Sequence, residues 1–182
     1  MENQSENYIK YQKLVEGKNI NPQTLLATDY LNHFNEVHML LGMIAEMPDC
    51  IEDVLGWEAI SYQQHFEMSV FQYKELAIEA YDHSPLQYKN AFEECVAEMD
   101  ELLLSTISLT EGAIKQNNYN QVTILVEEYN PKMEHLIDQC STIIDSKDTS
   151  AQQESVDDIF DAEDWDGESD AIDQDSIDDL FD

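Results

Sequence analysis

Apolar residues recur at intervals of three, four and seven along four long stretches of the chain, which is the spacing of one face of an α-helix. These stretches cover residues 23–47, 61–83, 85–116 and 121–145. No part of the chain shows the apolar–polar alternation of a β-strand over a useful length, and only five glycines are present. The pattern predicts an all-α fold, in which residues 22–146 form an antiparallel four-helix bundle-like domain.

Prolines mark the expected ends of these helices, because proline is tolerated in a first turn but disrupts a helix interior. Pro22 precedes the first helix and Pro48 ends it, and residues 48–56 then predict a short connecting helix that closes at a glycine. Pro131 lies inside the last stretch, so we expect a kink or a break near Asn130.

The two ends of the chain lack this periodicity. Residues 1–21 are polar with scattered aromatic residues, which predicts a flexible leader with room for a short helix. The apolar pattern stops at Ser146, and no Lys or Arg follows Lys147. A segment this acidic and this poor in apolar residues cannot bury enough surface to offset the entropy of ordering it. We therefore expect residues 147–182 to form a disordered acidic tail.

The tail contains one short phrase twice, because residues 153–161 read QESVDDIFD and residues 174–182 read QDSIDDLFD. In each copy three apolar residues at i, i+3 and i+4 would share one helix face. A Ser stands at the N-cap position with Asp residues in the first turn. We expect each copy to fold as about two helical turns on a partner's groove. The expected contact residues are the apolar Val156, Ile159, Phe160, Ile177, Leu180 and Phe181 and the acidic Asp157, Asp158, Asp178 and Asp179.

An acidic tail can also serve only to keep a protein in solution, since blocks of like charge usually stay solvated. Such a tail needs neither Phe160 nor Phe181, and it needs no Ser at the same offset in both copies. The duplication in register therefore favours a tail that binds another molecule.

Residues 173–181, with the sequence DQDSIDDLF, resemble the tail that closes many proteobacterial chemotaxis phosphatases of the CheZ family. A similar phrase opens the flagellar motor switch protein FliM. The resemblance implies that this tail docks on the phosphorylated chemotaxis response regulator CheY or on a related regulator. In the body, residues 28–36 resemble an uncharacterised helical family of proteobacteria, which implies no activity.

The same resemblance raises an enzymatic alternative, a divergent phosphatase that acts on a response regulator. The CheZ family carries an Asp-x-Thr-Gly-Gln type phrase on a bundle helix, and the nearest fragment here, residues 109–112 (LTEG), lacks the Gln. The unrelated CheC and CheX phosphatases use Glu-x-x-Asn, a spacing that Glu127 and Asn130 satisfy and that residues 16–19 satisfy as well. Glu127 and Asn130 are the catalytic candidates, although the absence of a catalytic site is the simpler interpretation.

A bundle that binds a metal or a small ligand is the second alternative, because the chain contains five histidines. Helical di-iron sites pair Glu-x-x-His phrases from two helices, and the sequence has none. The metal candidates are His33, Glu36 and His38, but the spacing of Glu36 and His38 directs them to different sides of a helix. We expect neither a metal nor another cofactor.

The net charge of −32 restricts the partners. It leaves no basic footprint for nucleic acid and disfavours an anionic membrane surface. The polar N-terminus lacks the apolar segment of a secretory signal. Three widely spaced cysteines without a C-x-x-C phrase argue against a disulfide framework. We therefore predict a cytoplasmic helical adaptor whose tail docks on a protein partner, such as a response regulator, with a homodimer left open.

Overall fold

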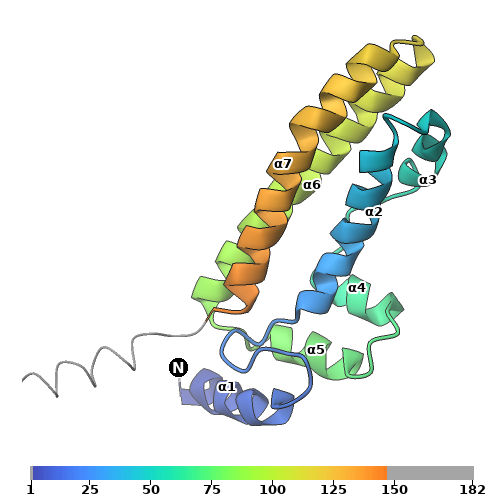
Figure 1. The fold of residues 1–182 in the computed structure, drawn as a ribbon. Coiled ribbons are helices and arrows are strands. Elements are labelled where there is room, and N and C mark those ends of the chain that lie inside the picture. The colour runs from blue at the N-terminus through green and yellow to red at the C-terminus, as the bar shows by residue number, and fades with distance from the viewer. Residues whose placement is uncertain (1, 147–182) are drawn as a thin grey trace, which may run out of the picture. The chain divides into compact units, whose positions relative to one another are not determined.

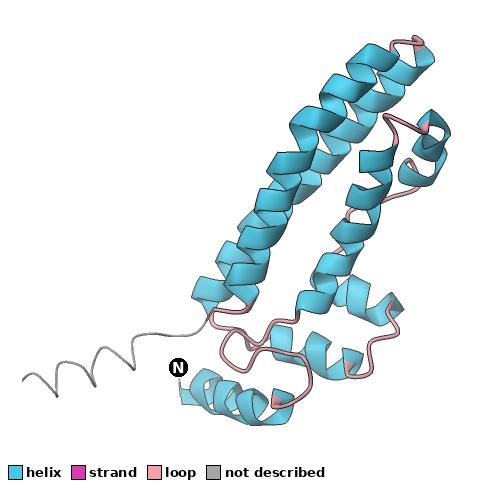
Figure 2. Ribbon diagram, in the orientation of Figure 1, coloured by secondary structure: helices cyan, strands magenta, loops and turns pink. Residues whose placement is uncertain are grey.

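The computed structural model describes residues 2–146, with side chains from Ser5 onward (Figure 1). Every regular element in this part of the chain is a helix, as Figure 2 shows, which confirms the predicted all-α class for it. None of these helices combines the length and the apolar character needed to cross a membrane. The elements are α1 (Glu2–Val15), the 3₁₀ turn η1 (Thr28–Leu31), α2 (Asn32–Met43), the 3₁₀ turn η2 (Pro48–Cys50), α3 (Ile51–Val54), α4 (Tyr62–Met68), α5 (Lys74–Tyr81), α6 (Leu86–Lys115) and α7 (Tyr119–Ile144).

The predicted tail, residues 147–182, lies outside the described residues together with all ten of its expected contact residues. The described structure is therefore that of the body of the chain.

The two longest helices, α6 and α7, form a hairpin, and both match the stretches predicted from the apolar spacing. In the turn between them Asn117 has a φ of 56°, which lies in the left-handed region. The side chain of Asn118 caps α7 by accepting a hydrogen bond from the backbone N–H of Gln121 at 3.2 Å. Asparagine suits both positions, since it tolerates left-handed backbone and caps helices well.

Helix α7 continues through Pro131, so the break considered near Asn130 does not occur. Proline removes one backbone hydrogen bond from a helix interior. Tyr129 and Met133, on either side of the proline, are both buried in the core. Packing of this apolar face keeps the helix intact, because most helical stability in proteins comes from tertiary contacts.

The remaining helices pack against one side and one end of the hairpin. Helix α2 lies alongside α7, α3 contacts α2 and α6, and α5 contacts α1. Figure 1 shows α1, α4 and α5 near the end of the hairpin at which α6 begins and α7 ends. Two of the four expected long helices are therefore present, while residues 23–47 and 61–83 are interrupted.

Aromatic rings fill the core where this layer meets α6. Tyr30 of η1 is fully buried, and its ring centroid lies 5.7 Å from that of Phe34, 5.5 Å from that of Tyr62 and 5.4 Å from that of Phe92. The Tyr30 hydroxyl donates a hydrogen bond to the carbonyl of Ile60 at 2.9 Å. Burial of a large apolar side chain contributes about 1.5–3 kcal/mol to folding, so this cluster is a main source of stability.

Helix α2 begins at Asn32, well after the expected start at Gln23. Before it, the Asn21 side chain accepts hydrogen bonds from the backbone N–H groups of Gln23 and Thr24 at 2.8 and 3.2 Å, which forms a turn. Leu25 then has a φ of 58°, a conformation that a right-handed helix excludes. Its side chain is nevertheless buried.

The expected helix over residues 61–83 is divided into α4 and α5. The hydroxyl of Ser69 donates to the carbonyl of Phe66 at 3.3 Å and accepts from the backbone N–H of Phe71 at 3.2 Å. These bonds stabilise a turn in place of the helix. Neither glycine nor proline stands at this break, so the sequence carries no strong marker for it.

Helix α1 occupies most of the expected flexible leader, and this is a correction to the sequence analysis. Tyr11 and Val15 are buried. The Tyr11 ring stacks on His83 with the centroids 4.6 Å apart, and its hydroxyl donates to a carboxylate oxygen of Glu79 at 3.1 Å. These partners lie far away in sequence, so local patterning did not reveal that the leader belongs to the fold.

Candidate functional site

A cleft of about 560 Å³ opens between the start of α2 and the end of α4. Its polar side chains come from η1, α2 and α4, and its apolar rim comes from α4 and the residues on either side of it. The lining residues are Asp29, Asn32, His33, Glu36, Ile60, His65, Met68, Ser69, Val70 and Phe71. We call this hollow the polar cleft. A second hollow of about 440 Å³ adjoins it and shares Asp29, Asn32 and Phe71.

Local structure holds the polar side chains of the cleft in place. The amide of Asn32 donates a hydrogen bond to a carboxylate oxygen of Asp29 at 3.2 Å, which links η1 to the first turn of α2. Helix α4 starts at a capping box, in which Ser61 and Gln64 each bond the other's backbone N–H. That cap fixes the helix that carries His65, and the edge of the His65 ring packs at 5.5 Å from the Tyr30 ring.

Two histidines and one carboxylate meet inside the polar cleft. Nε2 of His65 lies 3.6 Å from a carboxylate oxygen of Asp29, and the rings of His33 and His65 are 6.2 Å apart. The His33 ring also stacks on Trp57, whose indole N–H donates to the His33 carbonyl at 3.2 Å. The fold therefore brings together residues that are far apart along the chain.

Burial is the main influence on the ionisation of His33. Burial lowers its pKa below the ordinary value, the nearby His65 lowers it further, and a hydrogen bond to the backbone of Glu58 partly opposes both. His33 is thus a neutral imidazole at neutral pH. Within the described residues, Nε2 of His33 and Nε2 of His65 are buried without a hydrogen-bond partner.

The one hydroxyl of the polar cleft is engaged in local structure. Among the residues that line it, Ser69 carries the sole hydroxyl, and both capacities of that hydroxyl are used in the turn after α4. An activated nucleophile needs a base within hydrogen-bond reach, and Ser69 makes no such contact to His33 or His65. The carboxylates of Asp29 and Glu36, which line the cleft, suit a ligand that brings hydrogen-bond donors or positive charge.

The exposed side of α2 extends this site beyond the cleft. Asn32, Glu36, Met39 and Met43 follow one another at spacings of four, three and four, and all four side chains are exposed. Such spacing places them on one helix face, which we call the α2 face. Its first two residues line the polar cleft, so cleft and face form one continuous surface.

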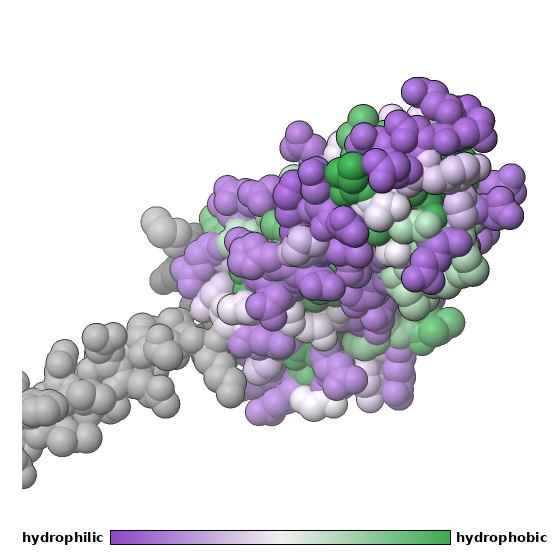
Figure 3. Space-filling view, turned by 45° about the horizontal axis from the view of Figure 1, so that its top comes forward, coloured by the Kyte–Doolittle hydropathy of each residue, from purple (hydrophilic) through white to green (hydrophobic). Residues whose placement is uncertain are grey.

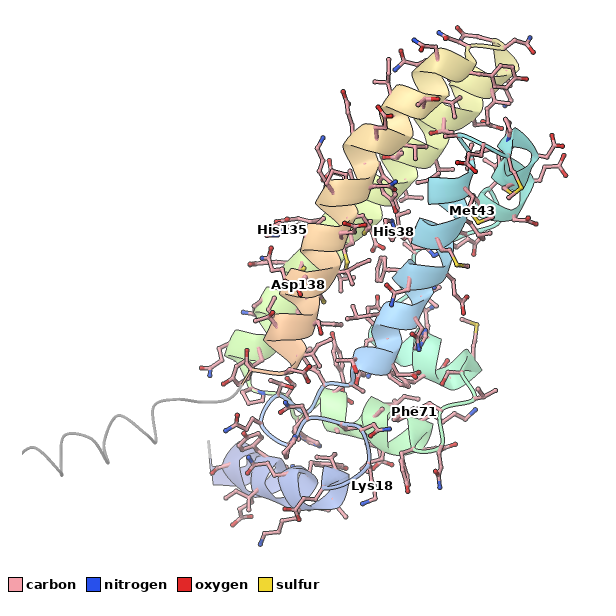
Figure 4. All side chains as sticks on the ribbon, in the orientation of Figure 1. Lys18, His38, Met43, Phe71, His135 and Asp138 are labelled. Atoms are coloured by element: carbon pink, nitrogen blue, oxygen red, sulfur yellow. The ribbon has the colours of Figure 1, made fainter. Side chains whose placement is uncertain are left out.

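The three metal candidates divide between two sides of α2. His33 and Glu36 line the polar cleft, whereas His38 packs against Tyr129 of α7 with the rings 5.5 Å apart. Figure 4 shows His38 on the side of α2 toward α7 and Met43 on the side away from it. Within residues 2–146 no group of three or more His, Cys, Asp or Glu side chains could hold a metal ion.

The two phosphatase candidates lie in different surroundings on α7. Glu127 is exposed on α7, but the Asn130 amide faces α2, where its atoms lie 3.7 and 3.8 Å from the position that a Cβ on Gly42 would take. The Asn130 carbonyl oxygen is buried. The Asn130 side chain therefore contributes to the contact between α2 and α7.

Sequence reasoning missed Asp29 and His65 as members of the site. Asp29 lies inside the polar and aromatic segment over residues 28–36, and this mixed composition was the available signal. His65 lies on another helix, and only the packing of α4 against η1 brings it to Asp29.

No protein-family model, no curated protein and no solved structure matches the chain.

Proposed function

We propose that this protein is a cytoplasmic adaptor, with a helical bundle as its body and an acidic tail that docks on another protein. The partner that fits the tail is a response regulator of the chemotaxis or two-component type. The observation that carries the proposal is the duplication in register of one apolar triplet, preceded by Ser, within a segment that contains no Lys or Arg. Apolar residues at i, i+3 and i+4 anchor amphipathic helices in the grooves of their partners.

The body supports binding over catalysis. The polar cleft with the α2 face presents carboxylates and exposed methionines, while the one hydroxyl that lines the cleft is engaged in a turn. The amide of Asn130 packs against Gly42 of α2. An adaptor needs none of this machinery.

Two copies of the motif have an energetic consequence. If the partner offers two sites, the first contact holds the second motif at a high effective concentration, and avidity exceeds the affinity of either copy. The acidic residues around each triplet steer the tail toward a basic surface and accelerate association, an effect that salt weakens.

The test is titration of the full-length chain into a purified chemotaxis response regulator, with and without a stable phosphoryl mimic, followed by calorimetry. We expect binding that strengthens with the mimic and that is lost in the Phe160→Ala, Phe181→Ala double variant. The matched control is Leu104→Ala with Leu109→Ala, which truncates two exposed residues of α6. Circular dichroism of all variants should show unchanged helicity.

Adding the protein to a radiolabelled phosphorylated regulator separates the adaptor from the phosphatase alternative. Binding with an unchanged rate of label loss supports the adaptor, and faster loss would favour the enzyme. The proposal would be overturned if the chain bound the regulator in neither phosphorylation state. It would also be overturned if the Phe160→Ala, Phe181→Ala variant bound with the affinity of the wild type.

A further inference from the structure

Six of the thirteen large apolar side chains that are exposed in the described residues lie between residues 39 and 70. The set consists of Met39, Met43, Met47, Leu55, Met68 and Val70. Val70 is fully exposed, and Met39 and Met68 keep 61% and 69% of their accessible surface. Single exposed apolar residues are normal on a protein, but a group of them marks an interaction surface.

These side chains border the surface already described. Met39 and Met43 belong to the α2 face, and Met68 and Val70 form part of the rim of the polar cleft at its other end. Helix α3, which Leu55 follows, packs against α2. In Figure 3, pale green hydrophobic surface lies on the side of the molecule that carries α2 and α3.

Acidic residues dominate the charge of this region. Residues 19–73 contain no Lys or Arg but eight acidic residues, which gives a formal charge of −8. Seven of the eight side chains are exposed, and the eighth, Asp29, lines the polar cleft. The described Lys residues lie elsewhere, in α1, α5, α6, α7 and the residues just after α1. One of them, Lys74 of α5, reaches the rim of the polar cleft, where its Nζ donates to the carbonyls of Glu67 and Ser69 at 3.3 and 3.4 Å. Apart from Lys74, the charge around the exposed apolar side chains is negative.

Methionine suits a surface that receives a helix, because its flexible and polarizable side chain adapts to different apolar partners. Charge complementarity then requires the arriving segment to be basic. The acidic tail of the same chain and a second copy of this surface both carry the wrong sign. The occupant that satisfies both conditions is an amphipathic helix with Lys or Arg around its apolar stripe.

We infer that the α2 face and the apolar rim of the polar cleft together dock a basic amphipathic helix of another protein. Its apolar residues contact Met39, Met43 and Met68, and its cations face the carboxylates of Glu36 and Asp29. This site lies on the body and is independent of the tail motifs, so the chain would join two partners. A substitution that abolishes binding at one of these two sites should leave binding at the other unchanged.

The probe is a synthetic Leu–Lys peptide of about 14 residues, or four helical turns, with Leu at i, i+3, i+4 and i+7. It is titrated into the full-length chain labelled with ¹³C at the methionine methyl groups, and single substitutions assign the resonances. We expect the signals of Met39, Met43 and Met68 to shift. Met99 and Met133, which are fully buried, should keep theirs and act as internal references.

A pair of variants tests the surface itself. Met39→Gln with Met43→Gln keeps the length and the helix propensity of both side chains and removes their apolar character, so the peptide should bind about tenfold more weakly. The control is Leu104→Gln with Leu109→Gln on exposed positions of α6, which should change the affinity by less than about twofold.

Because the chain is so acidic, a Lys-rich peptide is also attracted by charge alone. A peptide of the same composition in scrambled order measures that contribution, and it should bind more weakly and leave the three methionine signals in place. The Phe160→Ala, Phe181→Ala chain should bind the ordered peptide as the wild type does. The inference would be overturned if the ordered and scrambled peptides bound with equal affinity. It would also be overturned if the Met39→Gln, Met43→Gln chain bound the ordered peptide as tightly as the wild type does.

Discussion

The α6–α7 hairpin and the layer formed by residues 2–85 are held together in different ways. The hairpin consists of two helices that are adjacent in sequence and pack along their length. The layer consists of short elements joined by hydrogen bonds over long sequence separations, such as the backbone N–H of Ala27 to the hydroxyl of Tyr62 at 2.9 Å. The hairpin is therefore stabilised by a repeated apolar pattern, whereas the layer depends on hydrogen bonds between specific polar groups.

The surfaces of the two regions differ as well. Lys89, Lys115 and Lys132 interrupt the acidic surface of the hairpin. The Lys residues of the layer lie before residue 19 or at Lys74, and residues 19–73 have no basic residue except histidine. The irregular region also carries the polar cleft and the α2 face. Short elements and turns therefore expose binding groups, while the regular hairpin supports them.

Among the substitutions that test this comparison, Tyr30→Ala should have the largest effect on the free energy of unfolding. The substitution removes a fully buried ring that contacts several others and a hydroxyl that bonds the Ile60 carbonyl. We expect it to lower the free energy of unfolding by about 4–5 kcal/mol, against about 3 kcal/mol for Leu103→Ala in the hairpin. Urea unfolding followed by circular dichroism measures both. If Leu103→Ala proved the more damaging, the hairpin would be the main source of stability.

The same comparison explains how much of the fold was predictable. Helices α6 and α7 follow their apolar spacing, since their buried faces are set by local repetition. The turn at Asn21, the left-handed Leu25 and the break at Ser69 arise from side-chain hydrogen bonds that compete with the helix, and the apolar pattern runs through all three.

The candidate site was predictable only in part. His33 and Glu36 could be named from one helix, because they share a segment of mixed polar and aromatic composition. Asp29 and His65 could not be paired, since their 3.6 Å contact depends on the packing of α4 against η1.

Thr24→Val should have an intermediate effect. The Thr24 hydroxyl is buried and donates to the carbonyl of Ile144 at 2.7 Å, and valine leaves that carbonyl without this donor. We expect a loss of about 1–2 kcal/mol in the free energy of unfolding. Thr123→Val is the control, because the Thr123 hydroxyl is bonded within its own helix at an exposed position. Similar losses for the two variants would contradict the special importance of long-range bonds in the layer.

Asp100→Asn should have the smallest effect on stability, and this effect should appear only at neutral pH. Burial raises the pKa of Asp100 on α6 to about 6, so folding disfavours its ionised form and stability falls as the pH rises from about 4 to 6. The amide removes this penalty. The midpoint of thermal unfolding should rise by roughly 1–3 °C at pH 7.5 and match the wild type near pH 4. Asp138→Asn, at an exposed position of α7 (Figure 4), is the control. A gain that is equal at both pH values would contradict this assignment.

Thr24 also connects three distant parts of the chain, because its own carbonyl accepts a hydrogen bond from the Ser84 hydroxyl at 2.6 Å. The two bonds span sequence separations of 60 and 120 residues. During synthesis, the first of these partners leaves the ribosome long before the last. The hydrogen bond between Thr24 and Ile144 can form only once α7 is complete. Contacts of such long range slow folding. The aromatic core residues are thus synthesised well before the helix that completes the hydrogen bonds of Thr24.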